Sequence, residues 1–194
     1  MSWIIGRVRT VTWSAVDLYY IDANDVPQAD TIKIELSLNG GGAWSEVEAS
    51  VPNTGSYQWT VTGPATIQAQ LRFTGVVLSD VTFTTSDFTI EDEVLTTIGV
   101  GPGTTVIIPP GGTYDFDATG YNQDGEAMGA TPVWTTDGGG TIDAATGEFT
   151  GGATAGGPWT ITATDGAVIG TATLYVRAAR NATSKIRIAI TMGI

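Results

Sequence analysis

The chain has 194 residues, of which 42% are hydrophobic and 14% are charged, and it contains no cysteine and no histidine. Without these two residue types, disulfides, cysteine or histidine zinc sites, and thiol or serine–histidine catalysis are excluded. The formal net charge of -12 argues against nucleic acid as a partner, because phosphates require a basic face.

The charges divide the chain into an acidic body and basic ends. All 20 acidic residues lie between Asp17 and Asp165, an interval in which only Lys33 and Arg72 are basic. The other six basic residues are Arg7, Arg9, Arg177, Arg180, Lys185 and Arg187. The 26 glycines suit short strands with tight turns, and the length suits two β-sandwiches of about 90 to 100 residues each.

Residues 1–92 are expected to form the first sandwich. Four aliphatic residues between positions 32 and 38 alternate with polar ones, and a second alternation covers residues 57–62. The passages IKIELSLNGGGAW, PNTGSYQWTVTGPATIQAQLRF and SDFTI resemble fibronectin type III-like or Ig-like accessory modules of bacterial extracellular proteins. That resemblance implies a β-sandwich with no catalytic role.

An acidic loop within this first half offers oxygen ligands that could bind calcium. It contains Asp22, Asn24, Asp25 and Asp30. The spacing lacks the central glycine and terminal glutamate of a twelve-residue calcium loop. Because aspartate and asparagine also favour turns, a solvated loop is the preferred interpretation and no metal site is predicted.

Residues 93–177 are expected to form the second sandwich, after a short acidic junction at residues 91–93. Alternating segments separated by Gly, Asp and Asn recur every eight to twelve residues or so in this half, which is typical of an antiparallel sandwich. The passages GGTYDFDATGYNQDGEA, VW, GTIDAATGEFT and GTAT resemble the bacterial immunoglobulin-like group 2 family over about residues 94–177. The resemblance implies a non-catalytic module that serves as a spacer or adhesive unit on bacterial surface proteins, secreted enzymes or phage particles.

The last segment, residues 178–194, is predicted to be a basic extension strand. Three isoleucines at every second position give it one apolar face. We expect this strand to add to a sheet edge of a neighbouring molecule, although it could instead complete a sheet in its own chain, beside the N-terminal strand. The candidate assembly residues are Arg7, Arg9, Arg180, Lys185, Ile186, Arg187, Ile188 and Ile190.

The six tryptophans raise the possibility of sugar binding, because aromatic faces stack on sugar rings. Trp13, Trp59 and Trp134 lie in apolar alternations and are expected in the core. Trp44 and Trp159 lie beside glycine-rich turns, and these two are the candidate glycan contacts. Two scattered aromatic side chains do not make a platform, so glycan binding remains an alternative.

Together these features predict a non-catalytic, all-β structural protein with no cofactor. The first twenty residues lack a secretory signal pattern, which favours a phage-like virion component, such as a capsid decoration or tail protein. The expected partners are copies of itself or a major capsid or tail protein, with neither nucleic-acid binding nor membrane insertion. The alternatives are a carbohydrate-binding or spacer module of a secreted bacterial surface protein, at the cell surface or outside it, and a subunit of an extracellular filament.

Overall fold

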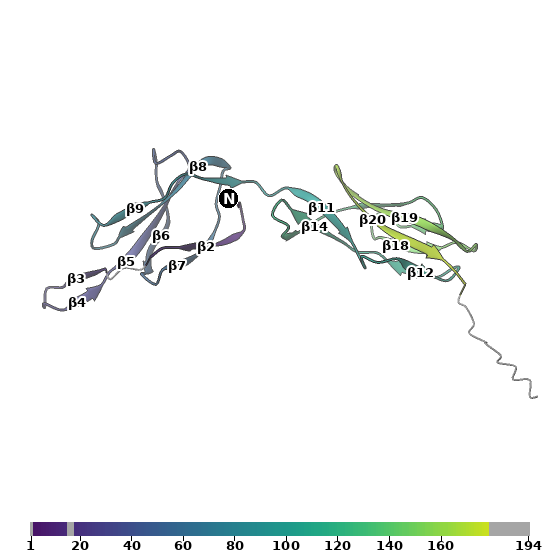
Figure 1. Ribbon diagram of the computed structural model, residues 1–194, viewed down its shortest axis with the longest axis horizontal. Coiled ribbons are helices and arrows are strands. Elements are labelled where there is room, and N and C mark those ends of the chain that lie inside the picture. Colours follow the sequence, from purple (N-terminus) through teal and green to yellow (C-terminus); the bar gives the residue numbers. More distant parts are fainter. Residues whose placement is uncertain (1, 15–17, 179–194) are drawn as a thin grey trace, which may run out of the picture. The chain divides into compact units, whose positions relative to one another are not determined.

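The computed structural model describes residues 2–14 and 18–178, and every regular element within them is a β-strand (Figure 1). The chain divides into two compact units, unit 1 from Met1 to Glu93 and unit 2 from Val94 to Ile194. The sequence prediction set this boundary after residue 92. The expected extension strand lies outside the described residues, apart from Ala178 at its start. In the described part of the chain, no helix is long and apolar enough to span a membrane.

Unit 1 contains ten strands. They are β1 Ser2–Ile4, β2 Val8–Thr12, β3 Tyr19–Ile21, β4 Pro27–Ala29, β5 Thr31–Ser37, β6 Ser45–Pro52, β7 Ser56–Thr60, β8 Thr66–Gly75, β9 Thr82–Thr84 and β10 Phe88–Glu91. Six of them form one sheet in the order β1-β10-β8-β5-β6, with β9 also paired to β8. Strands β2 and β7 form a second, two-stranded sheet, and β3 and β4 form a hairpin that projects from the rest of the unit (Figure 1).

The six-stranded sheet and the β2–β7 sheet of unit 1 share one core, which makes the unit a sandwich. On β5 the alternation predicted from the sequence is present, because Ile32, Ile34 and Leu36 are buried while the residues between them are half-buried. Val11 of β2 and Trp59 of β7 are buried in the same apolar cluster. Burial of these side chains from both faces supplies the main stabilising free energy of unit 1.

Two carboxylates organise the loops of unit 1 around the β3–β4 hairpin. Asp22 accepts hydrogen bonds from the backbone N–H groups of Asn24 (2.9 Å) and Val26 (3.0 Å) and so closes the turn of the hairpin. Asp30 is buried and accepts backbone N–H groups from Val77 (3.0 Å) and Leu78 (2.9 Å), which fixes the loop between β8 and β9. The acidic loop predicted from the sequence is therefore held by its own carboxylates.

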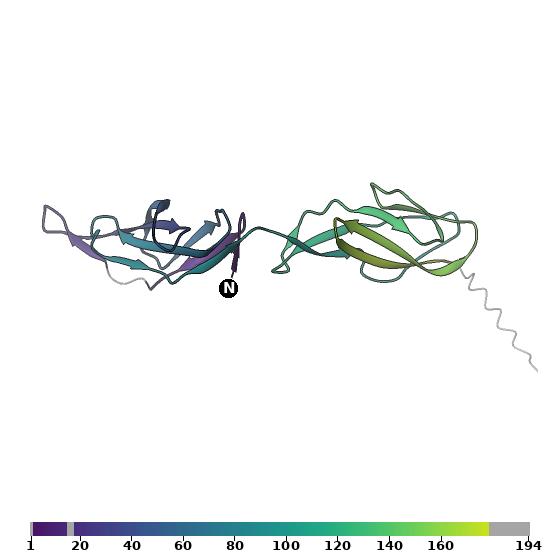
Figure 2. The same cartoon turned by 90° about the horizontal axis from the view of Figure 1, so that it is seen from above.

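Unit 2 also contains ten strands. They are β11 Leu95–Val100, β12 Val106–Ile108, β13 Thr113–Asp115, β14 Ala118–Asn122, β15 Ala127–Met128, β16 Val133–Thr136, β17 Gly140–Ile142, β18 Glu148–Gly151, β19 Gly156–Asp165 and β20 Val168–Val176. They form three sheets, in the orders β12-β20-β19-β16, β11-β14-β15 and β13-β18-β17. The long antiparallel pair β19–β20 is the green-to-yellow pair of strands in Figure 2.

Local turn chemistry explains the hairpins of unit 2. The turn after β14 has Gly125 at φ +77°, and the Asn122 N–H donates to the carbonyl of Glu126 (3.0 Å), as the Asp-Gly pair predicts. The predicted hairpin between Gly140 and Thr150 is present as the β17–β18 pair. Phe149 of β18 is fully buried and Trp134 of β16 is 3% exposed, and both belong to the apolar core of unit 2.

Candidate functional site

Unit 1 has an open groove between its six-stranded sheet and the β2–β7 sheet, on the side of β2 and β9. The cavity has a volume of about 850 Å³ and a mainly apolar lining. Its walls come from the β2 segment on one side and from β8, β9 and the start of β10 on the other. The lining residues used below are Trp3, Thr10, Val11, Thr12, Trp13, Phe73, Val81, Phe83 and Phe88.

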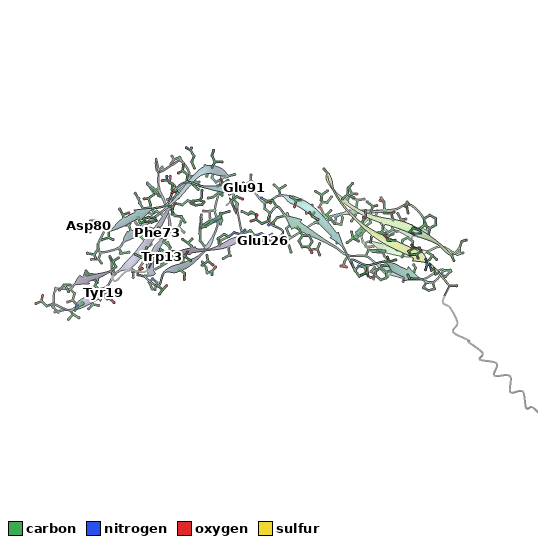
Figure 3. The ribbon with its side chains drawn as sticks, in the orientation of Figure 1. Trp13, Tyr19, Phe73, Asp80, Glu91 and Glu126 are labelled. Carbon is green, nitrogen blue, oxygen red and sulfur yellow. The ribbon has the colours of Figure 1, made fainter. Side chains whose placement is uncertain are left out.

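Aromatic side chains form the floor and rim of this groove. The ring centroids of Trp13 and Phe73, both labelled in Figure 3, are 5.5 Å apart. The ring centroids of Phe73 and Phe83 are 6.4 Å apart. Trp3 and Phe88 make a further pair at 5.0 Å. Phe73 is buried, but Phe83 is 64% exposed, so apolar surface extends from the core of unit 1 to solvent. A continuous apolar surface of this kind makes the groove a candidate binding surface.

The backbone hydrogen bonds of β2 show which of its residues face away from β7. The Trp13 N–H donates to the carbonyl of Gly55 (3.0 Å), and the Val61 N–H donates to that of Arg7 (3.0 Å). Odd-numbered residues of the β2 segment therefore bond to the β7 segment, and the backbone groups of Val8, Thr10 and Thr12 point away from it. Among the described residues, no strand pairs with this edge of β2.

The edge of β9 has the same arrangement on the opposite rim of the groove. The Gly75 N–H donates to the carbonyl of Val81 (3.0 Å), and the Thr85 N–H donates to that of Leu71 (2.9 Å). The backbone groups of Thr82 and Thr84 therefore point away from β8. Among the described strands, β1 pairs with β10 and not with β9.

The sequence did not predict this groove, although it identified several of its residues as apolar. Trp13 was expected in the core together with Trp59 and Trp134. The latter two are 4% and 3% exposed, whereas Trp13 is only half-buried and lines the groove. The Trp13 indole N–H donates to the Asn53 side-chain oxygen (2.8 Å), which fixes the ring at the rim. Trp13 therefore packs against the core of unit 1, as expected, but it is not fully buried and it also lines the groove.

Two of the predicted assembly residues lie within the described chain. The Arg7 guanidinium is paired with the Glu93 carboxylate of the same unit, with Nε 2.6 Å from Oε1. Arg9 lies on β2 opposite Trp59. The structure thus gives Arg7 an ion pair within its own unit. The remaining predicted residues, Arg180, Lys185, Ile186, Arg187, Ile188 and Ile190, lie outside the described residues.

The two candidate glycan contacts lie in different units, and each packs against its own unit. In unit 1 the Arg72 guanidinium lies over the Trp44 ring, 4.3 Å from its centroid. The same Arg72 pairs with Glu35 (2.8 Å), which also contacts Lys33 (3.0 Å). Burial acts to raise the pKa of Glu35, but hydrogen bonds and charge from these two cations outweigh it and hold that pKa below the ordinary value.

In unit 2 Trp159 lies against glycine backbone. Its ring is so close to Gly138 and Gly139 that an added Cβ at Gly139 would lie 2.4 Å from Trp159 Cδ1. Trp159 is half-buried and packs against the core of unit 2. Trp44 and Trp159 therefore do not combine into one aromatic platform within either unit.

Several carboxylates with shifted pKa values hold local backbone. Asp143 accepts N–H groups from Thr146 (2.8 Å) and Ala145 (2.9 Å), and these bonds lower its pKa. The bonds from Val26 and Asn24 lower the pKa of Asp22 in the same way. Within residues 2–14 and 18–178, no group of three or more acidic side chains is arranged to hold a metal ion.

Comparisons with known proteins find similarity among solved structures. No family model matches the chain, and no curated protein matches it. Solved structures with a similar fold include domains 4-9 of the surface layer protein SbsC, at 19% identity and a TM-score of 0.47 over 83% of this chain and 25% of that one. They also include domains 4 and 5 of SbsC alone, at 16% identity and a TM-score of 0.45 over 90% and 99% of the two chains.

A third similar structure contains fibronectin(III)-like modules of Clostridium thermocellum CbhA, at 16% identity and a TM-score of 0.27 over 99% of this chain and 94% of that one. The chain spans about a quarter of the length of the first SbsC structure. Similarity at these identities concerns fold alone. The predicted all-β class is confirmed by the structure itself, because every regular element of the described residues is a β-strand and the chain divides into two compact units, each with its own apolar core.

Proposed function

We propose that the protein is a non-catalytic structural module of an extracellular or cell-surface assembly, in which copies of the chain associate with one another. The observation that carries this proposal is the open apolar groove of unit 1, which lies beside an edge of β2 that pairs with no strand of residues 2–14 and 18–178. An edge with free backbone groups and an adjacent apolar surface is a template for a strand from another chain.

The carboxylates described above support a structural role. Asp22, Asp30 and Asp143 bond to nearby backbone, and Glu35 pairs with two cations. Each of these four has a lowered pKa, which keeps the carboxylate charged, whereas a general acid needs a raised pKa. These four groups therefore serve the fold.

We also propose where the assembly is located. The sequence prediction of a phage-like virion depends on the lack of a secretory signal pattern in the first twenty residues and on the basic tail. The resemblance of the first half is to accessory modules of bacterial extracellular proteins, and the family that the second half resembles occurs on bacterial surface proteins and secreted enzymes as well as on phage particles. We therefore favour a bacterial surface or extracellular assembly over a virion. Antibodies against the chain should label intact producing cells, and labelling of purified phage-like particles alone would reverse this preference.

Sedimentation velocity of the purified full-length chain over a range of concentrations tests the proposed function. Association that increases with concentration is expected, and negative-stain electron microscopy should show oligomers or polymers. A chain that remains monomeric at every concentration, in low and in physiological salt, would contradict the proposal.

A further inference from the structure

We propose that the groove of unit 1 binds residues 184–192 of a second copy of this chain, as a strand added along the free edge of β2. The choice of a second copy rests on the proposed function, since a contact between the tail of one chain and the groove of the next can propagate into a ring or filament. The proposal goes beyond that function by naming both surfaces of the contact.

The pattern of the tail matches the shape of the groove. In residues 184–192, SKIRIAITM, three isoleucines alternate with Arg187, Ala189 and Thr191. An added strand lies about 4.8 Å from its neighbour and points every second side chain to the same face. Ile186, Ile188 and Ile190 would then enter the cavity between Val11, Trp13 and the phenylalanines, while the polar residues face solvent.

The lengths also agree. Strand β2 has five residues, and the isoleucine pattern covers the five positions from 186 to 190. At about 3.4 Å per residue, the three isoleucines span roughly 14 Å. The backbone groups of Val8, Thr10 and Thr12 would supply the hydrogen bonds, and the cavity would supply apolar burial.

Charge favours the same pairing. Residues 178–194 contain Arg180, Lys185 and Arg187 and no acidic residue, whereas unit 1 has twelve acidic and four basic side chains. Asp80, which directly precedes the groove residue Val81, is exposed on the β9 rim (Figure 3). A cationic strand is therefore attracted to unit 1, and this attraction should weaken as salt increases.

Paired substitutions in the tail test which face of the strand enters the groove. Ile188→Asp puts a charge on the inward face, and Ala189→Asp puts the same charge on the outward face one residue away. Ile188→Asp should weaken self-association of the full chain about tenfold or more, because an unpaired carboxylate would enter an apolar cavity, while Ala189→Asp should have a much smaller effect. Equal effects of the two would overturn the strand geometry.

Two proline substitutions distinguish the edge of β2 from the edge of β9. Thr10→Pro removes an N–H that points away from β7, and Thr82→Pro removes one that points away from β8, so neither removes a backbone hydrogen bond of the native sheets. Each also removes a threonine hydroxyl that bonds to the neighbouring strand, so the two variants are matched in this respect. Near-ultraviolet circular dichroism should confirm that both variants fold. Thr10→Pro should abolish association and Thr82→Pro should retain it, and the reverse result would overturn the assignment to β2.

Disulfide trapping identifies the chain that donates the strand. Because the chain has no native cysteine, every disulfide must form between introduced cysteines. A chain with Thr10→Cys is mixed with a separate chain carrying Ala189→Cys, both on outward faces, and then oxidised. Thr12→Cys is tested in parallel, because a two-residue register shift preserves the faces. A disulfide between the two different chains is expected, and Ile188→Cys on the inward face should cross-link poorly.

The remaining outcomes separate failure of this inference from failure of the proposed function. If a double variant with Thr10→Cys and Ala189→Cys forms only a monomeric internal disulfide, the strand comes from its own chain and the second copy is wrong. If the full chain associates but neither Ile188→Asp nor Thr10→Pro alters association, the groove is not the contact and the structural function stands. Native mass spectrometry that finds an apolar small molecule retained in the groove, together with tail-independent association, would also overturn the inference.

Discussion

At the scale of single residues, the contact between Trp159 and the glycine turn shows why an aromatic residue beside glycines need not be a binding surface. The sequence placed Trp159 among candidate glycan contacts because flanking glycines commonly leave a ring exposed. In the structure the absence of side chains at Gly138 and Gly139 instead lets the ring lie against their backbone. The glycines thus provide space for packing, and Trp159 contributes to the core of unit 2.

A pair of glycine substitutions tests this interpretation of Trp159. Gly139 and Gly125 both have positive φ, +79° and +77°, but an added Cβ at Gly125 meets nothing within 4 Å. Gly125→Ala should lower the free energy of unfolding by about 1–2 kcal/mol from backbone strain alone. Gly139→Ala should cost a further 1–3 kcal/mol or so, because the methyl group displaces the ring. Urea denaturation measures both, and equal losses would show that Trp159 moves freely.

The buried carboxylate of Asp30 should make the stability of unit 1 depend on pH. Burial acts to raise its pKa, but hydrogen bonds from backbone N–H groups outweigh burial and lower that pKa below the ordinary value. A lowered folded-state pKa stabilises the fold above the unfolded pKa of about 3.9, and this contribution is lost as the pH falls through the folded-state pKa.

Asp30→Asn should therefore destabilise unit 1 at pH 7 by about 1–3 kcal/mol, since one carboxylate oxygen becomes an NH₂ group that cannot accept the loop N–H groups. The difference between the variant and the native chain should shrink below pH 4. Urea denaturation at pH 7 and pH 3 measures it, with Asp80→Asn on the exposed rim as the control. A difference that does not change with pH would refute the role of charge at Asp30.

At the scale of elements, the sequence predicted the positions of several strands. It did not predict which strand edges remain without a neighbouring strand. The alternation in β5 and the Asp-Gly turn after β14 depend on neighbours along the chain, and a local pattern records them. The openness beside β2 depends on whether a third strand reaches its edge, which is a tertiary property. Val11 and Trp13 have the same apolar alternation in either case, so the sequence placed Trp13 in the core and did not predict the groove.

The hairpin β3–β4 is a second feature that the sequence did not predict. The sequence analysis identified this segment only as an acidic, solvated loop, because its proline and aspartate residues are typical of turns and not of strands. Asp22 and Asp25, the latter at φ +59°, form the turn that joins β3 to β4. The turn-forming acidic residues thus predicted the turn correctly, but they did not indicate the two short strands that flank it.

Substitutions of the phenylalanines of β8 and β9 should distinguish an effect on the stability of unit 1 from an effect on self-association. Phe73 is 7% exposed and Phe83 is 64% exposed, although their rings are neighbours. Phe73→Ala should lower the free energy of unfolding by about 3–5 kcal/mol. Phe83→Ala should cost well under about 1 kcal/mol, as expected for a surface side chain, yet weaken self-association because the groove loses part of its rim. If Phe83→Ala leaves association intact, the rim of β9 takes no part in it.

At the scale of the whole molecule, the two units have separate cores and should unfold separately. Each apolar cluster draws its buried residues from one unit only. Differential scanning calorimetry of the full chain should therefore show two transitions, and Phe149→Ala, at a fully buried position, should lower only the transition of unit 2. A single transition that shifts as a whole would show that the units are energetically coupled.

The central claim is that copies of this chain join through the tail of one and the open groove of another. Its most direct test is sedimentation velocity of the full-length chain beside a chain ending at residue 178, at matched concentrations. The account predicts concentration-dependent association of the full chain and a folded monomer for the shortened one. Identical association of the two chains, or a full-length chain that stays monomeric throughout, would contradict it.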